Sequence, residues 1–169
     1  MASVHDVAAD ILSRLGRMSA MKLQKLVYYC QAWHLVWDQE PLFPERIEAW
    51  ANGPVVRALF EKHRGEFTVA TWPWGDPAKL TKDERESINA VIRDYGELDG
   101  RKLSHLTHSE DPWRDARAGL SPTARSNREI TPAAMECYYG AIDADEEATP
   151  VEDLNWGDWE EYVDPADVA

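Results

Sequence analysis

The sequence predicts an all-α fold, and three observations support this prediction. Apolar side chains recur every three to four residues in several segments, which is the spacing of one buried helix face. Two segments open with a capping box, in which a Ser or Thr precedes an acidic residue by three positions. Alternating apolar and polar residues, which would indicate half-buried strands, are nearly absent. We expect a compact single-domain helical bundle of about six to seven helices, followed by an acidic, flexible C-terminal tail.

Two helices are predicted at the start of the chain. Ser3 caps a helix over Val4–Leu15, which ends at Gly16. Ser19 caps the longest helix, Ala20–Trp37. The buried stripe of this second helix consists of Leu23, Leu26, Val27, Cys30, Trp33, His34 and Trp37.

The middle of the chain is predicted to contain one helix between irregular segments. A short segment, Ile47–Trp50, precedes the Gly53-Pro54 step, which we interpret as a tight turn between packed helices. Proline is favoured at the first helical position, so Pro54 is predicted to start a helix that ends near Arg64. Residues 65–79 are rich in turn formers and are expected to be irregular.

Four helices are predicted in the second half. The capping box at Thr81 opens a helix that runs to Tyr95 and ends at Gly96. Three shorter helices follow, over Arg101–His108, Asp111–Gly119 and Thr131–Ile142.

The charge of the chain is concentrated at its C-terminal end. The net charge is -13, and eleven of the 31 acidic residues lie between Asp143 and Ala169, where there is no Lys or Arg. We therefore divide the chain into a helical domain, residues 1–142, and an acidic tail, residues 143–169. Such a chain would repel phosphates, so direct nucleic-acid binding is not expected.

Composition also bears on the compartment. No apolar run is long enough to span a membrane, and the N-terminus lacks the pattern of a signal peptide, so we expect a cytoplasmic protein without a membrane partner. Cys30 and Cys137 lie on apolar helix faces, and both are predicted to be buried thiols that form no disulfide.

Metal and catalytic sites have little support in the sequence. Cys30 and His34 are four residues apart, and His105 and His108 three apart, but neither pair has a second pair at metal-motif spacing. We predict no metal and no cofactor. His108, with Glu110 or Asp111 beside it, could act as the general base of a small hydrolase.

The alternative is that His108 closes one helix by bonding its last carbonyls, while Pro112 starts the next and Trp113 fixes the corner. No nucleophile with an orienting partner is recognisable nearby, so we favour this alternative and predict that the protein is not an enzyme.

Exposed aromatic and basic residues are the predicted partner contacts. Trp72 and Trp74 lie in the proline-rich WPWGDP loop, and Trp residues are common at the energetic centres of interfaces. Both rings are expected to be exposed unless the loop folds back onto the domain, and the alternative is that at least one of them packs in the core. The other candidates are Lys22 and Lys25 in the second helix and the tail residues Trp156, Trp159 and Tyr162.

Three separated motifs resemble a known family. KLQKLVYYCQAWHL begins at Lys22, IEAW-x-x-GPVV-x-x-LF at Ile47 and LTH-x-x-x-PW at Leu106. Together they resemble the Panacea domain, also called SocA-like, over roughly residues 4–143. The motif positions that we regard as structural are Gly53, Pro54, Thr107, His108, Pro112 and Trp113.

The resemblance implies an all-helical fold and a binding function. It implies an antitoxin that binds and neutralises a cognate protein toxin, which the neighbouring gene encodes. The tail could cover a basic site on that toxin. One branch of the family instead implies an adaptor that delivers its toxin to a cytoplasmic protease, and the sequence does not separate these two alternatives.

Overall fold

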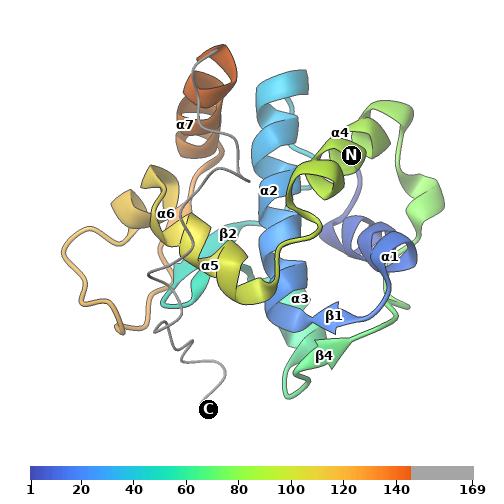
Figure 1. The fold of residues 1–169 in the computed structure, drawn as a ribbon, viewed down its shortest axis with the longest axis horizontal. Coiled ribbons are helices and arrows are strands. Elements are labelled where there is room, and N and C mark those ends of the chain that lie inside the picture. The colour runs from blue at the N-terminus through green and yellow to red at the C-terminus, as the bar shows by residue number, and fades with distance from the viewer. Residues whose placement is uncertain (146–169) are drawn as a thin grey trace.

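The computed structural model describes residues 1–145, and within them the chain is predominantly α-helical, as predicted (Figure 1). Its α-helices are α1 (Val4–Leu15), α2 (Ala20–Asp38), α3 (Arg57–His63), α4 (Lys82–Tyr95), α5 (Gly100–His108), α6 (Asp111–Ala116) and α7 (Pro132–Ala144). A short 3₁₀ helix, η1 (Pro77–Lys79), lies in the segment that was expected to be irregular.

Helix α2 forms the centre of the molecule. It packs against α4, α5 and α7, with a smaller contact to α1, and Figure 1 shows it between α7 on one side and α1 and α4 on the other. The sequence predicted one buried stripe, but α2 is buried on nearly all sides, because Tyr28, Tyr29 and Gln31 are also inaccessible. A helix surrounded in this way does not need a polar face.

The capping predictions are confirmed. Ser3 and Asp6 form a capping box at α1, and Thr81 and Glu84 form the second at α4. In each box the hydroxyl accepts from the backbone three residues ahead, and the carboxylate accepts from the backbone of the cap residue. The Ser19 hydroxyl likewise accepts from the backbone at the start of α2.

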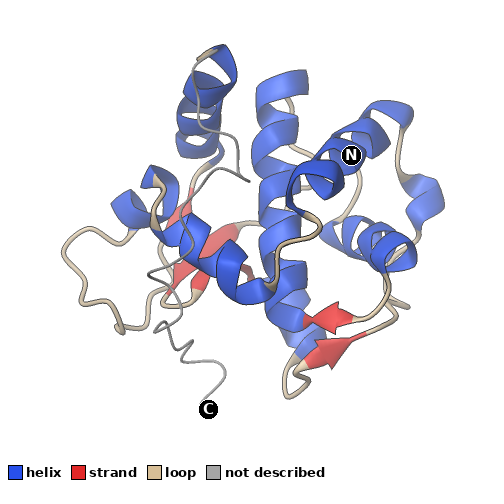
Figure 2. Ribbon diagram, in the orientation of Figure 1, coloured by secondary structure: helices blue, strands red, loops and turns tan. Residues whose placement is uncertain are grey.

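Short strands occur where the sequence led us to expect almost none (Figure 2). An antiparallel three-stranded sheet has the order β3-β2-β5. Its strands are β2 (Ile47–Trp50), β3 (Gly53–Val56) and β5 (Glu129–Ile130). A second pair joins β1 (Met18–Ser19) to β4 (Thr68–Val69).

The prediction that Pro54 starts a helix is wrong. Pro54 lies in β3 opposite Ala49, and α3 begins only at Arg57. The φ that proline imposes is compatible with an edge strand as well as with a first helical turn. The Gly53-Pro54 step therefore follows the turn of a β2–β3 hairpin, rather than a turn between helices.

Two predicted helix ends also move. Helix α6 ends at Ala116 rather than near Gly119, and α7 continues to Ala144 rather than ending near Ile142. The division into a domain and a tail stays a prediction, because residues 146–169 lie outside the described residues. Across residues 1–145, none of the helices has the length and apolar character that crossing a membrane requires.

Candidate functional site

The side chain of Gln24 holds the free edge of strand β3. Its Oε1 accepts from the Val56 N–H at 2.9 Å, and its Nε2 donates to the Val56 carbonyl at 3.2 Å. The same Nε2 lies 3.0 Å from Nε2 of His63. Because Gln24 is buried, this side-chain amide replaces the backbone pairing that another strand would provide. Burial lowers the pKa of His63, which favours the neutral ring that this contact needs.

The turn of the hairpin is packed against Lys25. The Lys25 ammonium donates to the Pro54 carbonyl at 3.2 Å. A Cβ on Gly53 would lie 2.6 Å from Cε of Lys25 and 3.0 Å from Oγ1 of Thr107. Gly53 also has a φ of 114°, which other residues rarely adopt. The backbone conformation therefore requires glycine here, and a larger residue would also have to displace the end of the Lys25 side chain.

The corner between α5 and α6 holds the hairpin from the other side. The Trp113 indole donates to the Trp50 carbonyl at 2.8 Å, and Arg117 donates to the Ala49 carbonyl at 2.9 Å. The rings of His108 and Trp113 stack with centroids 4.0 Å apart. Pro112 lies in the first turn of α6. The predicted corner, in which Pro112 starts a helix and Trp113 fixes the turn, is therefore present, and its side chains contact the hairpin.

The same interpretation expected His108 to bond the last carbonyls of its own helix, and this part of it is wrong. Its ring bonds the backbone of Ala51 in the hairpin turn. The carbonyls at the end of α5 accept instead from Thr107 and Ser109. Burial lowers the pKa of His108 to about 3, helped by the nearby charges of Lys25 and His105. The ring is therefore neutral, stacked and part of the packing.

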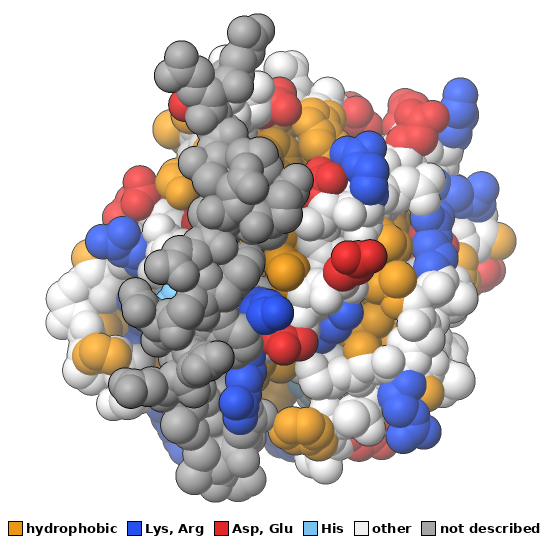
Figure 3. Space-filling view, in the orientation of Figure 1, with side chains coloured by type: hydrophobic (Ala, Val, Ile, Leu, Met, Phe, Trp, Pro, Cys, Tyr) orange, Lys and Arg blue, Asp and Glu red, His pale blue; other side chains and the backbone are white. Residues whose placement is uncertain are grey.

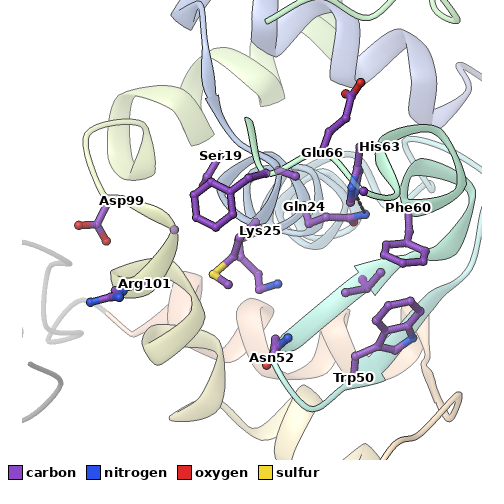
Figure 4. A pocket seen from close by; sticks show the side chains of 16 residues that line it. Ser19, Gln24, Lys25, Trp50, Asn52, Phe60, His63, Glu66, Asp99 and Arg101 are labelled. Atoms are coloured by element: carbon purple, nitrogen blue, oxygen red, sulfur yellow. Dashed lines mark hydrogen bonds between the residues drawn. The ribbon is translucent and has the colours of Figure 1, made fainter. Parts of the chain in front are cut away.

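A cavity of about 790 Å³ opens beside the β2–β3 hairpin (Figure 4). It lies between the start of α2, strand β3, helix α3 and the start of α5. Its volume is within the range typical of ligand sites. The apolar lining residues are Ala20, Met21, Trp50, Val55, Phe60 and Phe67. The polar and charged ones include Gln24, Lys25, Asn52, His63, Glu66, Asp99 and Arg101.

Asn52 lines this cavity, and one polar atom of its side chain is unsatisfied. Its Oδ1 is buried and has no hydrogen-bond partner among the described residues. The backbone of Asn52 is fixed, because its carbonyl accepts from the Ser104 hydroxyl at 2.6 Å. Figure 4 shows the Asn52 and Lys25 side chains pointing toward the same part of the cavity.

Comparison with protein families places these features in one unit. The family model described as "Antitoxin SocA-like, Panacea domain" matches residues 23–114, more than half of the chain. This chain is a member of the Panacea family. The matched region contains the hairpin and most of the side chains that hold it, including Gln24 and Trp113 but not Arg117. Searches of curated proteins and of solved structures found no match.

The predicted contact residues of this Panacea domain fall in different environments. Trp72 is buried, and its indole lies 3.1 Å from Nδ1 of His5, whereas Trp74 is 47% exposed. The alternative that at least one ring packs in the core is therefore the one observed, because Trp72 is buried while Trp74 stays exposed. The Lys62 ammonium lies 5.5 Å from the centre of its ring.

The two lysines predicted as contacts are both engaged within the domain. Lys25 is buried, contrary to its expected exposure, because it supports the hairpin turn. Lys22 is half-buried and donates to the Gly96 carbonyl at 2.6 Å. Binding roles for these residues stay predictions. Trp156, Trp159 and Tyr162 lie outside the described residues.

The cavity was missed by sequence reasoning, because its lining comes from segments far apart in the chain. The Asn52-Gly53 pair was interpreted only as a turn signal, and a turn signal says nothing about an unsatisfied side chain. Cys137 is exposed, contrary to expectation, whereas Cys30 is buried as expected. Within residues 1–145, no group of three or more His, Cys, Asp or Glu could hold a metal ion.

Proposed function

We propose that this Panacea protein is an antitoxin that neutralises a cognate protein toxin by binding it directly. The observation that supports this proposal is the family match over residues 23–114, which includes the β2–β3 hairpin and most of the residues that line the cavity beside it. The partner is a toxin encoded by the neighbouring reading frame. A binding protein needs a stable scaffold and an accessible recognition surface, and we propose that the domain supplies both.

The chemistry of the motif residues supports a binding role. Gln24 and Trp113 hold backbone groups of the hairpin, and His108 stacks on Trp113. Each of these side chains is engaged in the fold. His108, the residue on which a hydrolase would depend, is not among the residues that line the cavity.

The visible surface favours a mixed contact over a purely electrostatic one. Figure 3 shows acidic, basic and apolar side chains interspersed on this face of the molecule. Trp74 remains a proposed anchor because it is exposed. We also propose that the acidic tail, residues 143–169, covers a basic site on the toxin, since it contains eleven acidic residues and no Lys or Arg.

The test is growth of bacterial cells that express the neighbouring reading frame, with and without this protein. We expect arrest by the neighbour alone and rescue by the full chain. A version ending at Asp145 retains all of α7 and isolates the contribution of the tail. If the neighbour arrests growth and the full chain fails to rescue, the antitoxin proposal is wrong.

The lifetime of the toxin separates sequestration from delivery to a protease. A sequestering antitoxin leaves the toxin lifetime unchanged or lengthens it, whereas an adaptor shortens it. The measurement is the decay of tagged toxin after synthesis is stopped, with and without this protein. We expect no shortening.

A further inference from the structure

We propose that in the free protein the acidic tail binds to the basic outer face of helix α5. This face, which we call the α5 face, consists of Arg101, Lys102 and His105. The segment that binds it is residues 152–162, which contains five acidic residues together with Trp156, Trp159 and Tyr162. A tail that is bound to its own domain has to leave α5 before it can contact a toxin.

The charge of α5 is the first argument. Among the α-helices of residues 1–145, α5 is the one that contains no Asp or Glu. Leu103 and Leu106 are buried on its inner side, where α5 packs against α2. Arg101 is exposed, and Lys102 and His105 are partly exposed, so the basic side chains lie on the opposite side. Figure 4 shows Arg101 pointing outward from the start of α5, away from the cavity.

Cations on two other helices are paired with acids instead. At the start of α3, the Arg57 guanidinium lies 2.9 Å from the carboxylate of Glu48. In α4, Arg93 lies 3.0 Å from Asp94. Each pair cancels much of the positive charge that an acidic segment would meet, so the α5 face is the better match in charge.

The aromatic residues of the segment are the second argument. A Trp ring is the best cation–π partner, and it can stack on an arginine guanidinium or accept a lysine ammonium. Trp156 and Trp159 lie among the acids of the segment, so carboxylates and rings can contact one basic face together. The domain already contains such a combination, because Arg57 pairs with Glu48 and also lies 5.3 Å from the centre of the Trp50 ring.

The length of the chain allows this contact. Helix α7 ends at Ala144, and Trp156 follows twelve residues later. Twelve residues can span about 40 Å, whereas a domain of this size has a radius of gyration of about 15 Å. Helix α6 contacts both α5 and α7, so the tail begins on a near neighbour of α5 (Figure 1).

The contact has one consequence for neutralisation. The basic site that we propose on the toxin competes with the α5 face for the same acidic segment. Toxin binding and release of the tail from α5 are then a single exchange. This consequence rests on the proposed antitoxin function, whereas the contact within the free protein does not.

Photo-cross-linking in the full-length protein tests the contact. The photoreactive residue p-benzoylphenylalanine is placed at position 159, and the attachment sites in the monomer are mapped by mass spectrometry after digestion. We expect attachment to α5 of the same chain. If α5 is not labelled, or if it is labelled only between two chains, the proposal is wrong.

Charge reversal supplies the matched variants. Arg101→Glu combined with Lys102→Glu should lower the yield of this cross-link about tenfold or more, because two attractive contacts become repulsive. Lys82→Glu combined with Arg85→Glu reverses two exposed cations of α4, so it changes the net charge equally and should leave the yield unchanged. Equal yields in the two double variants would overturn the proposal.

Two further measurements guard against loss of the fold. The melting temperature of each double variant shows whether the domain is intact. In the wild-type protein, raising NaCl to about 1 M should also lower the yield, because salt screens a contact between charged surfaces. A wild-type yield that does not respond to salt would contradict a contact based on charge.

The purified product of the neighbouring reading frame separates this inference from the proposed function. If the toxin binds and lowers the yield of the cross-link to α5, the exchange is supported. If the toxin binds and leaves this yield unchanged, the contact with α5 stands and the proposed contact between tail and toxin is wrong. If the wild-type protein does not bind the toxin, the antitoxin function fails, while the cross-link in the free protein still decides this inference.

Discussion

The two ends of helix α2 stabilise the domain by different chemistry. At its N-terminal end, Gln24 and Lys25 hold the β2–β3 hairpin through neutral backbone groups and leave an open cavity beside it. Toward its C-terminal end, Tyr28, Tyr29 and Trp33 enter a closed aromatic cluster. The first region stabilises the fold and also leaves a cavity open to solvent, whereas the second stabilises the fold and is closed.

The aromatic end contains one buried carboxyl group, that of Glu110. The hydroxyl of Tyr29 donates to it at 2.6 Å and that of Tyr139 at 2.9 Å, while the hydroxyls of Tyr28 and Tyr139 lie 3.0 Å apart. Burial raises the pKa of Glu110 to about 7, although the two tyrosine hydrogen bonds act in the opposite direction. Desolvation therefore outweighs hydrogen bonding at this carboxyl.

The two regions differ in the direction in which pH affects them. Burial lowers the pKa values of His63 and His108 at the hairpin end, and it raises that of Glu110 at the aromatic end. Acid should therefore weaken the hairpin end, because it drives protons onto buried histidines. Alkali should weaken the aromatic end, because it removes a proton from a buried carboxyl. The two regions should therefore contribute opposite slopes to the dependence of the unfolding free energy on pH.

The largest effect is expected from Gln24→Met, which nearly preserves shape and removes both hydrogen bonds to Val56. Two buried backbone groups then lose their partner, so the free energy of unfolding should fall by about 2–5 kcal/mol. Urea denaturation measures this loss. Glu86→Met on the exposed face of α4 is the control and should cause no comparable loss. If Gln24→Met leaves the free energy of unfolding unchanged, strand β3 does not depend on its hydrogen bonds to Gln24.

The next effect concerns Glu110 and pH. Its folded pKa, about 7, lies above the ordinary value of 4.5, so the stability that it contributes is complete below 4.5 and is lost as pH rises through 7. The loss amounts to about 3 kcal/mol. Glu110→Gln should remove this contribution, so its stability relative to the wild-type protein should rise with pH between 4.5 and 8 when both profiles are measured by urea denaturation. Glu86→Gln is the control and should follow the wild-type profile. A Glu110→Gln profile parallel to that of the wild-type protein would place the titrating group elsewhere.

His108 should produce the opposite slope. Its folded pKa, about 3, lies below the ordinary value of 6.5, so stability falls as pH falls from 6.5 toward 3. Between pH 6.5 and 4.5 this loss is about 2–3 kcal/mol, close to the simultaneous gain from Glu110. The wild-type profile should therefore be nearly flat in this window.

The variants separate these two contributions. Glu110→Gln should expose the histidine slope, with stability falling in acid, and His108→Asn should expose the carboxyl slope. The double variant should be flat again. A steep wild-type profile, or single variants without slopes, would contradict the assignment. A general base would predict a different result for His108→Asn, namely lost activity without lost stability.

Local sequence signals predicted the helices well. The capping boxes at Ser3 and Thr81 and the start of α2 after Ser19 each depend on side chains within a few residues of the helix end. The corner at Pro112 and Trp113 was also foreseeable, because proline marks a helix start. Such signals need no knowledge of distant contacts.

The failures share a physical cause, which is dependence on distant partners. Strand β3 was predicted as a helix because Pro54 suits either conformation, and the deciding contact comes from Gln24, far earlier in the chain. Glu110 was considered only as a neighbour of His108, and its burial depends on Tyr29 and Tyr139. The cavity at Asn52 likewise exists only after four separate elements have come together.

The smallest effect is expected from Lys22→Met at the first turn of α2. The Lys22 ammonium donates to the Gly96 carbonyl and so ties α2 to the end of α4, but a cation near a helix N-terminus opposes the helix dipole. These contributions partly cancel, so the unfolding free energy should fall by only about 1 kcal/mol. Lys82→Met in the first turn of α4, where the lysine is largely exposed, is the matched control for urea denaturation. A loss as large as that of Gln24→Met would mean that the hairpin end depends on this single cation. A loss of toxin binding at unchanged stability would instead support Lys22 as a contact residue.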